Sequence, residues 1–118
     1  MARVLLVDDD TTGLEIRRLL FEHAGHRVVA ASDPVEALAL CGEDAFDAAI
    51  VDVRLPAVGD GLALLRDLRR RHSALRLIVL CGDCSDLEGR PERDYVDEIF
   101  AKPVRAEKLL AAVKMKSS

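Results

Sequence analysis

Short apolar runs that alternate with stretches of helical periodicity constrain the fold of this chain more than any other feature. The runs at 4–7 and 77–80 read Val-Leu-Leu-Val and Leu-Ile-Val-Leu, without polar alternation. Such runs are typical of strands that are covered on both faces. Strands alternating with helices indicate a parallel sheet, so the sequence predicts a doubly wound α/β fold. The predicted strands are Arg3–Val7, Arg27–Ala31, Ala48–Asp52, Arg76–Leu80 and Glu98–Ala101.

The segments between the strands carry helix signals. In the first segment, Thr12 and Glu15 predict a capping box. In the second, Asp33 predicts an N-cap that is followed by Pro34. Apolar residues at helical spacing are expected to face the sheet. They are Ile16, Leu19, Leu20, His23 and Ala24, then Val35, Leu38 and Ala39, then Leu62, Leu65 and Leu68, and last Leu109, Leu110 and Val113.

The segment after the fourth predicted strand is the exception among the helical segments. Ser85 and Glu88 could open a helix there, but Gly89 and Pro91 interrupt the pattern soon afterwards. The sequence therefore predicts a short or irregular element in place of a full helix.

Size and charge narrow the class of protein. A chain of 118 residues, 50% of them hydrophobic, suits a single domain over 1–118, with a frayed tail at 114–118. The net charge of -4 lacks the basic excess that is typical of nucleic-acid binding. No apolar run approaches the ~20 residues that cross a bilayer, and the first strand begins too early for a signal peptide. We therefore expect a cytoplasmic domain that binds neither nucleic acid nor membrane.

The cysteines are Cys41, Cys81 and Cys84, an odd number in a chain that is large enough to fold without cross-links. Reduced thiols are expected on that ground. The pattern Cys81-Gly82-Asp83-Cys84 could also be a redox or zinc element. No second pair and no matching histidines accompany it, so two incidental thiols are the favoured interpretation.

Charged residues follow the predicted strands at the point where each strand ends. Asp8, Asp9 and Asp10 follow the first strand, Asp52 ends the third, and Lys102 follows the fifth. Ligands of doubly wound sheets bind at the carboxyl ends of the strands, so these side chains are expected to share one cleft. Crowded carboxylates resist joint ionisation unless a cation compensates them, and Mg²⁺ or Mn²⁺ suits oxygen ligands. Asp52, on the central strand, is the predicted nucleophile toward a phosphoryl group.

Three short motifs together resemble the receiver domains of two-component response regulators, the CheY-like superfamily. They are Val-Asp-Asp at 7–9, Asp-Val-Arg-Leu-Pro at 52–56 and Lys-Pro at 102–103. The similarity covers essentially the whole chain, and it implies the flavodoxin-like strand order 2-1-3-4-5. It also implies a signalling phosphoacceptor rather than a metabolic enzyme. Its partners would be a histidine kinase or histidine phosphotransfer protein and a downstream effector or fused domain, and a homodimer remains open.

The resemblance assigns roles to individual residues. Asp52 would take the phosphoryl group, and Lys102 would pair with the phosphoryl oxygens. Asp9, Asp52 and the backbone carbonyl of Arg54 would ligate Mg²⁺, and Asp8 would act mainly through a metal-bound water.

The chain also departs from the family at several positions. Cys81 stands where the family usually has Thr or Ser, and a thiol is a weak hydrogen-bond donor. We expect it to contact a phosphoryl group poorly and to weaken the coupling to the output face. Ile99 stands where the family has a switch aromatic, and the adjacent Phe100 is expected to face the opposite core. The loop at 56–61 is one residue longer than usual, and Arg54 beside it could gate small phosphodonors or be an ordinary surface arginine.

These departures leave a second functional interpretation open. The chain could be a degenerate receiver that binds a partner without phosphorylation. Cys81 and Ile99 favour this interpretation, whereas the intact acceptor, acidic residues and lysine favour phosphorylation.

Overall fold

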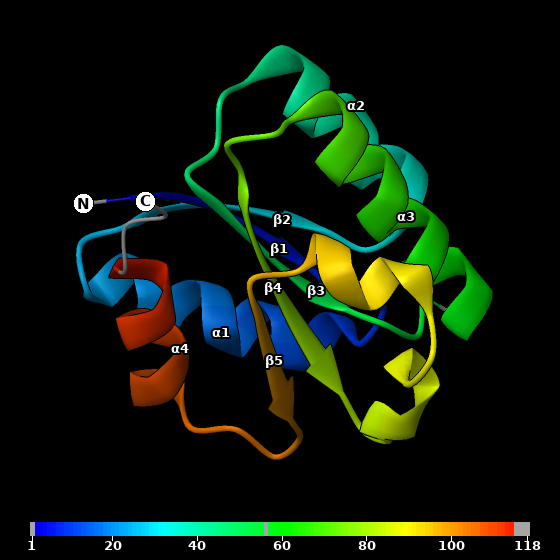
Figure 1. Cartoon of the computed structure of the whole chain (residues 1–118). Helices are drawn as coiled ribbons and strands as arrows, with labels where there is room; N and C mark the ends of the chain where they lie inside the picture. Colours follow the sequence, from blue (N-terminus) through cyan, green and yellow to red (C-terminus); the bar gives the residue numbers. More distant parts are fainter. Residues whose placement is uncertain (1, 56, 115–118) are drawn as a thin grey trace.

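A five-stranded parallel sheet forms the centre of the molecule, as Figure 1 shows. The structure is a computed structural model, and it describes residues 2–55 and 57–114. The strand order is β2-β1-β3-β4-β5, which confirms the predicted order and the doubly wound fold. The elements are β1 (Arg3–Val7), α1 (Thr11–His23), β2 (Arg27–Ala31), α2 (Pro34–Glu43), β3 (Ala48–Asp52), α3 (Val58–Arg71), β4 (Arg76–Cys81), η1 (Cys84–Leu87), η2 (Pro91–Tyr95), β5 (Glu98–Ala101) and α4 (Ala106–Lys114).

Both faces of the sheet are buried. Figure 1 shows α1 and α4 on one face and α2 and α3 on the other. Side chains of the central strands alternate between two apolar clusters, so that in β3 Val51 faces α2 and α3 while Ile50 faces α1 and α4. This two-sided burial explains why the strand sequences lack polar alternation. None of the helices in the part of the chain described here is long and apolar enough to span a membrane.

The predicted strands are confirmed, and only β4 differs, because it continues by one residue to Cys81. Parallel pairing places Asp52 of β3 opposite Leu80 of β4, and Cys81 opposite Ala101 of β5. The ends of the strands that carry the candidate residues therefore lie along one edge of the sheet.

Helix α1 turns a different face to the sheet from the predicted one. Leu14 and Phe21 are buried, whereas the side chains of the predicted inward stripe at Ile16, Leu19 and Leu20 are 56%, 53% and 46% exposed. The helix carries two apolar stripes, and the one that contains the bulky Phe21 ring buries more apolar surface against the sheet. The prediction of the buried stripe in α1 was wrong.

The cap of α1 also differs from the prediction. Asp10, not Thr12, is the N-cap, and its Oδ1 accepts a hydrogen bond of 3.3 Å from the backbone N–H of Gly13. Glu15, which was expected to complete a capping box with Thr12, instead accepts hydrogen bonds from the guanidinium of Arg18.

The N-cap of α2 is confirmed, but part of its buried face is not. Asp33 Oδ1 accepts a hydrogen bond of 2.8 Å from the backbone N–H of Glu36. Ala37 and Cys41 are buried, whereas Val35 is 79% exposed. Ala37 and Cys41 have small side chains, which allow the helix to lie close to β2 and α3. The larger Val35 side chain would keep the helix farther from the sheet if it were turned inward.

The predicted interruption after β4 is confirmed. Two 3₁₀ turns, η1 and η2, replace a helix, and Gly89 between them has a positive φ of 70°. Leu87 of η1 is only 1% exposed and joins the core on the α3 face. The guanidinium of Arg69 in α3 donates 2.8 Å hydrogen bonds to the carbonyls of Tyr95 and Leu75. The segment is thus irregular in shape but anchored.

The loop after β3 passes very close to the start of α3. A Cβ added at Gly61 would lie 1.7 Å from the carbonyl oxygen of Val53, so only glycine fits there. Pro56 and the predicted frayed residues 115–118 lie outside the described residues, whereas Lys114 is the last residue of α4.

Candidate phosphoryl and metal site

Three carboxylates gather at the carboxyl ends of β1 and β3. One oxygen from each of Asp8, Asp9 and Asp52 lies within 4.8 Å of the others. Asp8 and Asp52 are buried, at 2% and 6% exposure, whereas Asp9 is exposed. Within residues 2–55 and 57–114 this is the one group of three or more acidic, histidine or cysteine side chains close enough to share a metal ion. The convergence predicted from the ends of the strands is present.

Lys102 closes the site from the β5 side. Its ammonium group pairs with Oδ2 of Asp52 and lies 3.8 Å from Oδ2 of Asp8. The backbone N–H of Lys102 donates a 2.9 Å hydrogen bond to the carbonyl of Cys81, which ties the lysine to the end of β4. The peptide bond that follows, to Pro103, is cis.

Asp8 is held by groups from its own loop and from α1. Its Oδ1 accepts a 2.9 Å hydrogen bond from the backbone N–H of Asp10, and its Oδ2 lies 3.6 Å from the guanidinium of Arg17. Burial raises the pKa of Asp8, and the Asp52 carboxylate adds to this. The Asp10 N–H, Lys102 and Arg17 act in the opposite direction, without cancelling the effect of burial.

Sequence reasoning missed Arg17 as a member of this site. A signal was present, because Arg17 lies three residues after Leu14 and four before Phe21, on the buried face of α1. A basic residue on an inward face calls for a buried acidic partner. The position of Arg17 indicates this role only if Leu14 and Phe21 form the buried face of α1. The sequence pattern instead predicts the other apolar stripe, Ile16, Leu19 and Leu20, as that face.

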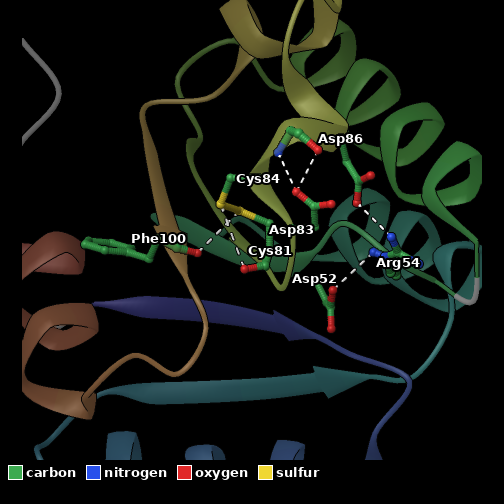
Figure 2. The surroundings of a disulfide bond; sticks show 8 residues. Asp52, Arg54, Cys81, Asp83, Cys84, Asp86 and Phe100 are labelled. Carbon is green, nitrogen blue, oxygen red and sulfur yellow. Dashed lines mark hydrogen bonds and ion pairs between the residues drawn. A yellow bond between two sulfur atoms is a disulfide. The ribbon is translucent and has the colours of Figure 1, made fainter.

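Arg54 contacts the carboxylate oxygen of Asp52 that does not pair with Lys102. Its backbone N–H donates a 3.1 Å hydrogen bond to Oδ1 of Asp52, which fixes the plane of that carboxylate. Its guanidinium lies 3.3 Å from Oδ2 of Asp86 in η1, as Figure 2 shows. Asp86 could not be predicted as a partner of Arg54, because only the folded chain brings η1 beside the loop after β3. The role of the Arg54 carbonyl as a metal ligand stays a prediction.

Cys81 and Cys84 form a disulfide, which corrects the prediction of two incidental reduced thiols (Figure 2). The turn through Gly82 and Asp83 brings the two Cα atoms to 5.2 Å, inside the range that a disulfide spans. Asp83 stabilises the turn, since its Oδ1 accepts hydrogen bonds of 3.0 Å and 2.6 Å from the backbone N–H and hydroxyl of Ser85. Cys41 is free and buried.

The positions of Ile99 and Phe100 agree with the prediction. They lie on opposite faces of β5, with Ile99 packed against the cluster under α2 and α3 and Phe100 against the cluster under α1 and α4. The position three residues before Lys102 therefore carries an aliphatic side chain.

The donor set of the acidic cluster fits a hard divalent cation. Carboxylate oxygens are the ligands that Mg²⁺ prefers, and Mg²⁺ keeps several waters in sites of this kind. Three carboxylates, two of them buried, lie beside only two cationic side chains, Lys102 and Arg17. A bound divalent cation would compensate the remaining negative charge.

Fold and site together define a doubly wound α/β domain with a cluster of three carboxylates and a lysine at the carboxyl edge of its sheet. Over residues 4–114 the chain matches the family described as the response regulator receiver domain. The chain belongs to this family, and hence to the proteins of two-component signalling.

Relatives and solved structures agree with this assignment. The response regulator MprA of Mycobacterium leprae is 36% identical over 113 residues, which are 95% of this chain and 49% of that protein. The chain thus spans about half the length of the curated relatives it matches. The crystal structure of a response regulator receiver domain protein from Clostridium thermocellum has a TM-score of 0.85 and 28% identity, covering 96% of this chain and 91% of that chain.

A second solved structure of similar fold contains bound groups. It is a response regulator protein from Burkholderia pseudomallei with a phosphorylated aspartic acid, a calcium ion and citrate. It has a TM-score of 0.85 and 29% identity, and the match covers 97% of this chain and 67% of that chain.

Proposed function

We propose that this domain accepts a phosphoryl group on Asp52 from a histidine kinase or histidine phosphotransfer protein, in a reaction that requires Mg²⁺ or Mn²⁺. The observation that carries the proposal is the position of the Asp52 carboxylate, which lies within one cluster with Asp8 and Asp9 and pairs with Lys102. The phosphorylated aspartic acid and calcium ion of the Burkholderia pseudomallei protein support the same chemistry.

The cation site would use the acidic cluster. Asp9 and Asp52 would ligate the ion with the Arg54 carbonyl, and Asp8 would act through a water molecule. A bound Mg²⁺ would neutralise negative charge on the phosphoryl oxygens.

Asp52 would act as the nucleophile. One carboxylate oxygen forms a bond to phosphorus while the bond from phosphorus to the donor nitrogen breaks, and the electron pair remains on the imidazole. The Arg54 N–H holds the carboxylate plane during this step. Lys102, which pairs with Asp52 before transfer, would then pair with a phosphoryl oxygen. Attack of water on phosphorus later restores Asp52, so the domain assists only its own phosphorylation and dephosphorylation.

The exposed face of α1 supports docking of a phosphodonor protein. Ile16, Leu19 and Leu20 are large apolar side chains, each close to half exposed or more, on the helix that begins directly after the acidic residues. Exposed apolar groups that gather on one face mark interaction surfaces. A donor helix on this face would bring its histidine near Asp52. We place the domain in the cytoplasm, and we assign relay of the signal to a downstream effector or a fused domain.

One observation favours a second candidate, a receiver that binds its partner without phosphorylation. The Cys81–Cys84 disulfide lacks the hydrogen-bond donor that a hydroxyl would offer at the end of β4. Such a domain would keep the fold and the docking face but would not form an acyl phosphate.

Mass measurement of the intact protein separates the two candidates. The domain is incubated with acetyl phosphate in the presence of Mg²⁺, and in a matched sample Mg²⁺ is removed with a chelator. Phosphoacceptor function predicts a gain of one phosphoryl group that depends on Mg²⁺. No gain in either sample, while the fold remains intact by circular dichroism, would support the phosphorylation-independent candidate instead.

A further inference from the structure

The Cys81–Cys84 disulfide is joined directly to the strands that carry the proposed site. Asp52 pairs with Leu80 across β3 and β4, and Cys81 is the next residue of β4. The Cys81 carbonyl accepts the 2.9 Å hydrogen bond from the backbone N–H of Lys102. One end of the disulfide is therefore attached to the segment that positions the lysine.

The other end of the disulfide leads to Arg54, a second contact of Asp52. Cys84 is the first residue of η1, and η1 carries Asp86. Asp86 pairs with the guanidinium of Arg54, whose backbone N–H holds Asp52 (Figure 2). Arg54 and Asp86 together form one rim of the acceptor site, and the cross-link restrains the segment that carries Asp86.

Reduction would add hydrogen-bond donors beside this rim and remove the covalent cross-link that restrains it. A disulfide has no S–H, so neither sulfur can donate a hydrogen bond. Cys81 Sγ lies 3.6 Å from the carbonyl oxygen of Phe100, and Cys84 Sγ lies 3.9 Å from that of Cys81. Two thiols at these positions would gain weak donors near these carbonyls, and the turn through Gly82 and Asp83 would lose its covalent closure.

The disulfide is open to attack from one side. Cys81 is fully buried, whereas Cys84 is half-buried, so we expect a reagent from solvent to attack the sulfur of Cys84 rather than that of Cys81. The remaining thiol, Cys41, is buried between α2 and the sheet in a different part of the molecule and takes no part in the exchange.

We propose that Cys81–Cys84 is a thiol-responsive redox site whose oxidised form slows phosphorylation of Asp52. The proposal rests on the phosphoacceptor function given above. In the oxidised form the cross-link keeps Asp86 against Arg54, and the rim over Asp52 stays closed. In the reduced form η1 is released, so a phosphodonor reaches Asp52 more readily.

The chemical step is thiol–disulfide exchange with a dithiol reductant. One thiolate of the reductant attacks Cys84 Sγ, the S–S bond breaks, and Cys81 leaves as a thiolate that takes up a proton. The second thiolate of the reductant then attacks the first sulfur of the reductant in the mixed disulfide. The bond from that sulfur to Cys84 breaks, and Cys84 leaves as a thiolate that also takes up a proton. The protein disulfide gains two electrons and two protons, and the reductant becomes a disulfide. The reverse exchange with an oxidised dithiol restores the cross-link.

The redox site can be tested without any phosphorylation. The folded protein is equilibrated in mixtures of reduced and oxidised dithiothreitol, the exchange is stopped with acid, and the thiols are labelled with a maleimide after unfolding and counted by mass. The proposal predicts three labels in the reduced protein, at Cys41, Cys81 and Cys84, and one label, at Cys41, in the oxidised protein. Three labels under every condition, including full oxidation, would mean that no disulfide forms and would overturn the proposal.

The link to Asp52 needs a second measurement. Oxidised and reduced samples, freed of dithiothreitol, are phosphorylated with phosphoramidate and Mg²⁺, and the rate is followed by intact mass. The oxidised form is expected to react roughly two- to tenfold more slowly, the range that the loss of one hydrogen bond spans. Cys84→Ser should react at the reduced rate under both conditions, whereas Cys41→Ala should keep the difference between the two forms.

The possible failures can be told apart. Equal rates for the oxidised and reduced wild-type protein would overturn the redox link and leave the phosphoacceptor function standing. No phosphorylation in either form would contradict the phosphoacceptor function, and with it the link, while the thiol count would still decide whether the disulfide is redox-active.

Discussion

The ends of β1 and β3 and the end of β4 lie along the same edge of one sheet, yet they carry different chemistry. The first region, defined by Asp8, Asp9 and Asp52, holds carboxylates that suit a cation and a phosphoryl group. The second region, from Cys81 through η2, holds a disulfide and two 3₁₀ turns in place of a helix. The groups that would perform phosphoryl transfer and the segment that would respond to it therefore lie in separate parts of this edge.

The largest effect is expected in the first region, from Asp52→Asn. The amide has the shape of the carboxylate but is not a nucleophile toward phosphorus, so phosphorylation by acetyl phosphate should be lost completely. The measurement is the intact mass after incubation with Mg²⁺. Phosphorylation of the variant at the wild-type rate would show that another residue is the acceptor.

Lys102→Gln should have the next largest effect. The substitution removes the cation that pairs with Asp52, and the rate of phosphorylation should fall by roughly 10²-fold, as for the loss of one group that stabilises transition-state charge. Lys108→Gln, at an exposed position of α4, makes the same change of charge away from the site. Similar rates for the two variants would argue against a role for Lys102 in transfer.

A third prediction concerns the cation site itself. Asp9→Asn should weaken Mg²⁺ binding by at least about tenfold, because even groups that only support a ligand contribute that much. Asp10→Asn is the matched control, since it removes the same charge one residue away and an Asn retains the N-cap of α1. Isothermal titration calorimetry with Mg²⁺ measures both affinities, and equal losses would indicate a general effect of charge.

Mg²⁺ affinity should begin to fall at a higher pH than the titration of an ordinary aspartate would give. Burial raises the pKa of Asp8, so this carboxyl takes up a proton at a higher pH than a free one. Because the cation favours the ionised form, affinity should fall as the pH falls, by no more than about tenfold per pH unit for one displaced proton. An affinity that stays constant until ordinary aspartates titrate would contradict this.

The smallest effect is expected where the two regions meet, at the pair of Arg54, after β3, and Asp86 in η1. The Arg54 side chain is 57% exposed and lies 3.3 Å from the carboxylate of Asp86. A double-mutant cycle with Arg54→Ala and Asp86→Ala should give a coupling free energy of about 0.2–1 kcal/mol in urea unfolding. A coupling near zero would show that this ion pair does not join the loop after β3 to η1.

The sheet was predictable because long-range and local signals agree there. Each strand is a run of apolar residues with no competing pattern, and the turn and cap residues between strands mark its ends. The acidic cluster followed from the same reasoning, since parallel strands bring the residues after their ends to one edge. Asp52 and Lys102, 50 residues apart, therefore converge as expected.

The parts that could not be predicted depend on choices between similar local patterns or on tertiary contacts. Helix α1 has two apolar stripes, and only packing against the sheet selects the one with Phe21. That choice also hid Arg17 as a partner of Asp8. The disulfide can form only if the backbone at Gly82 and Asp83 turns so that the two cysteines meet. The spacing of the cysteines in the sequence does not determine that backbone conformation.

The position of the phosphoryl group tests the proposed site most directly. After reaction with acetyl phosphate and Mg²⁺, borohydride reduces the acyl phosphate of an aspartate to homoserine, and peptide mapping by mass spectrometry identifies the residue. The arrangement of carboxylates and lysine predicts homoserine in place of Asp52, with Asp8 and Asp9 unchanged. Homoserine in place of Asp8 or Asp9, or none at all in a phosphorylated sample, would contradict it.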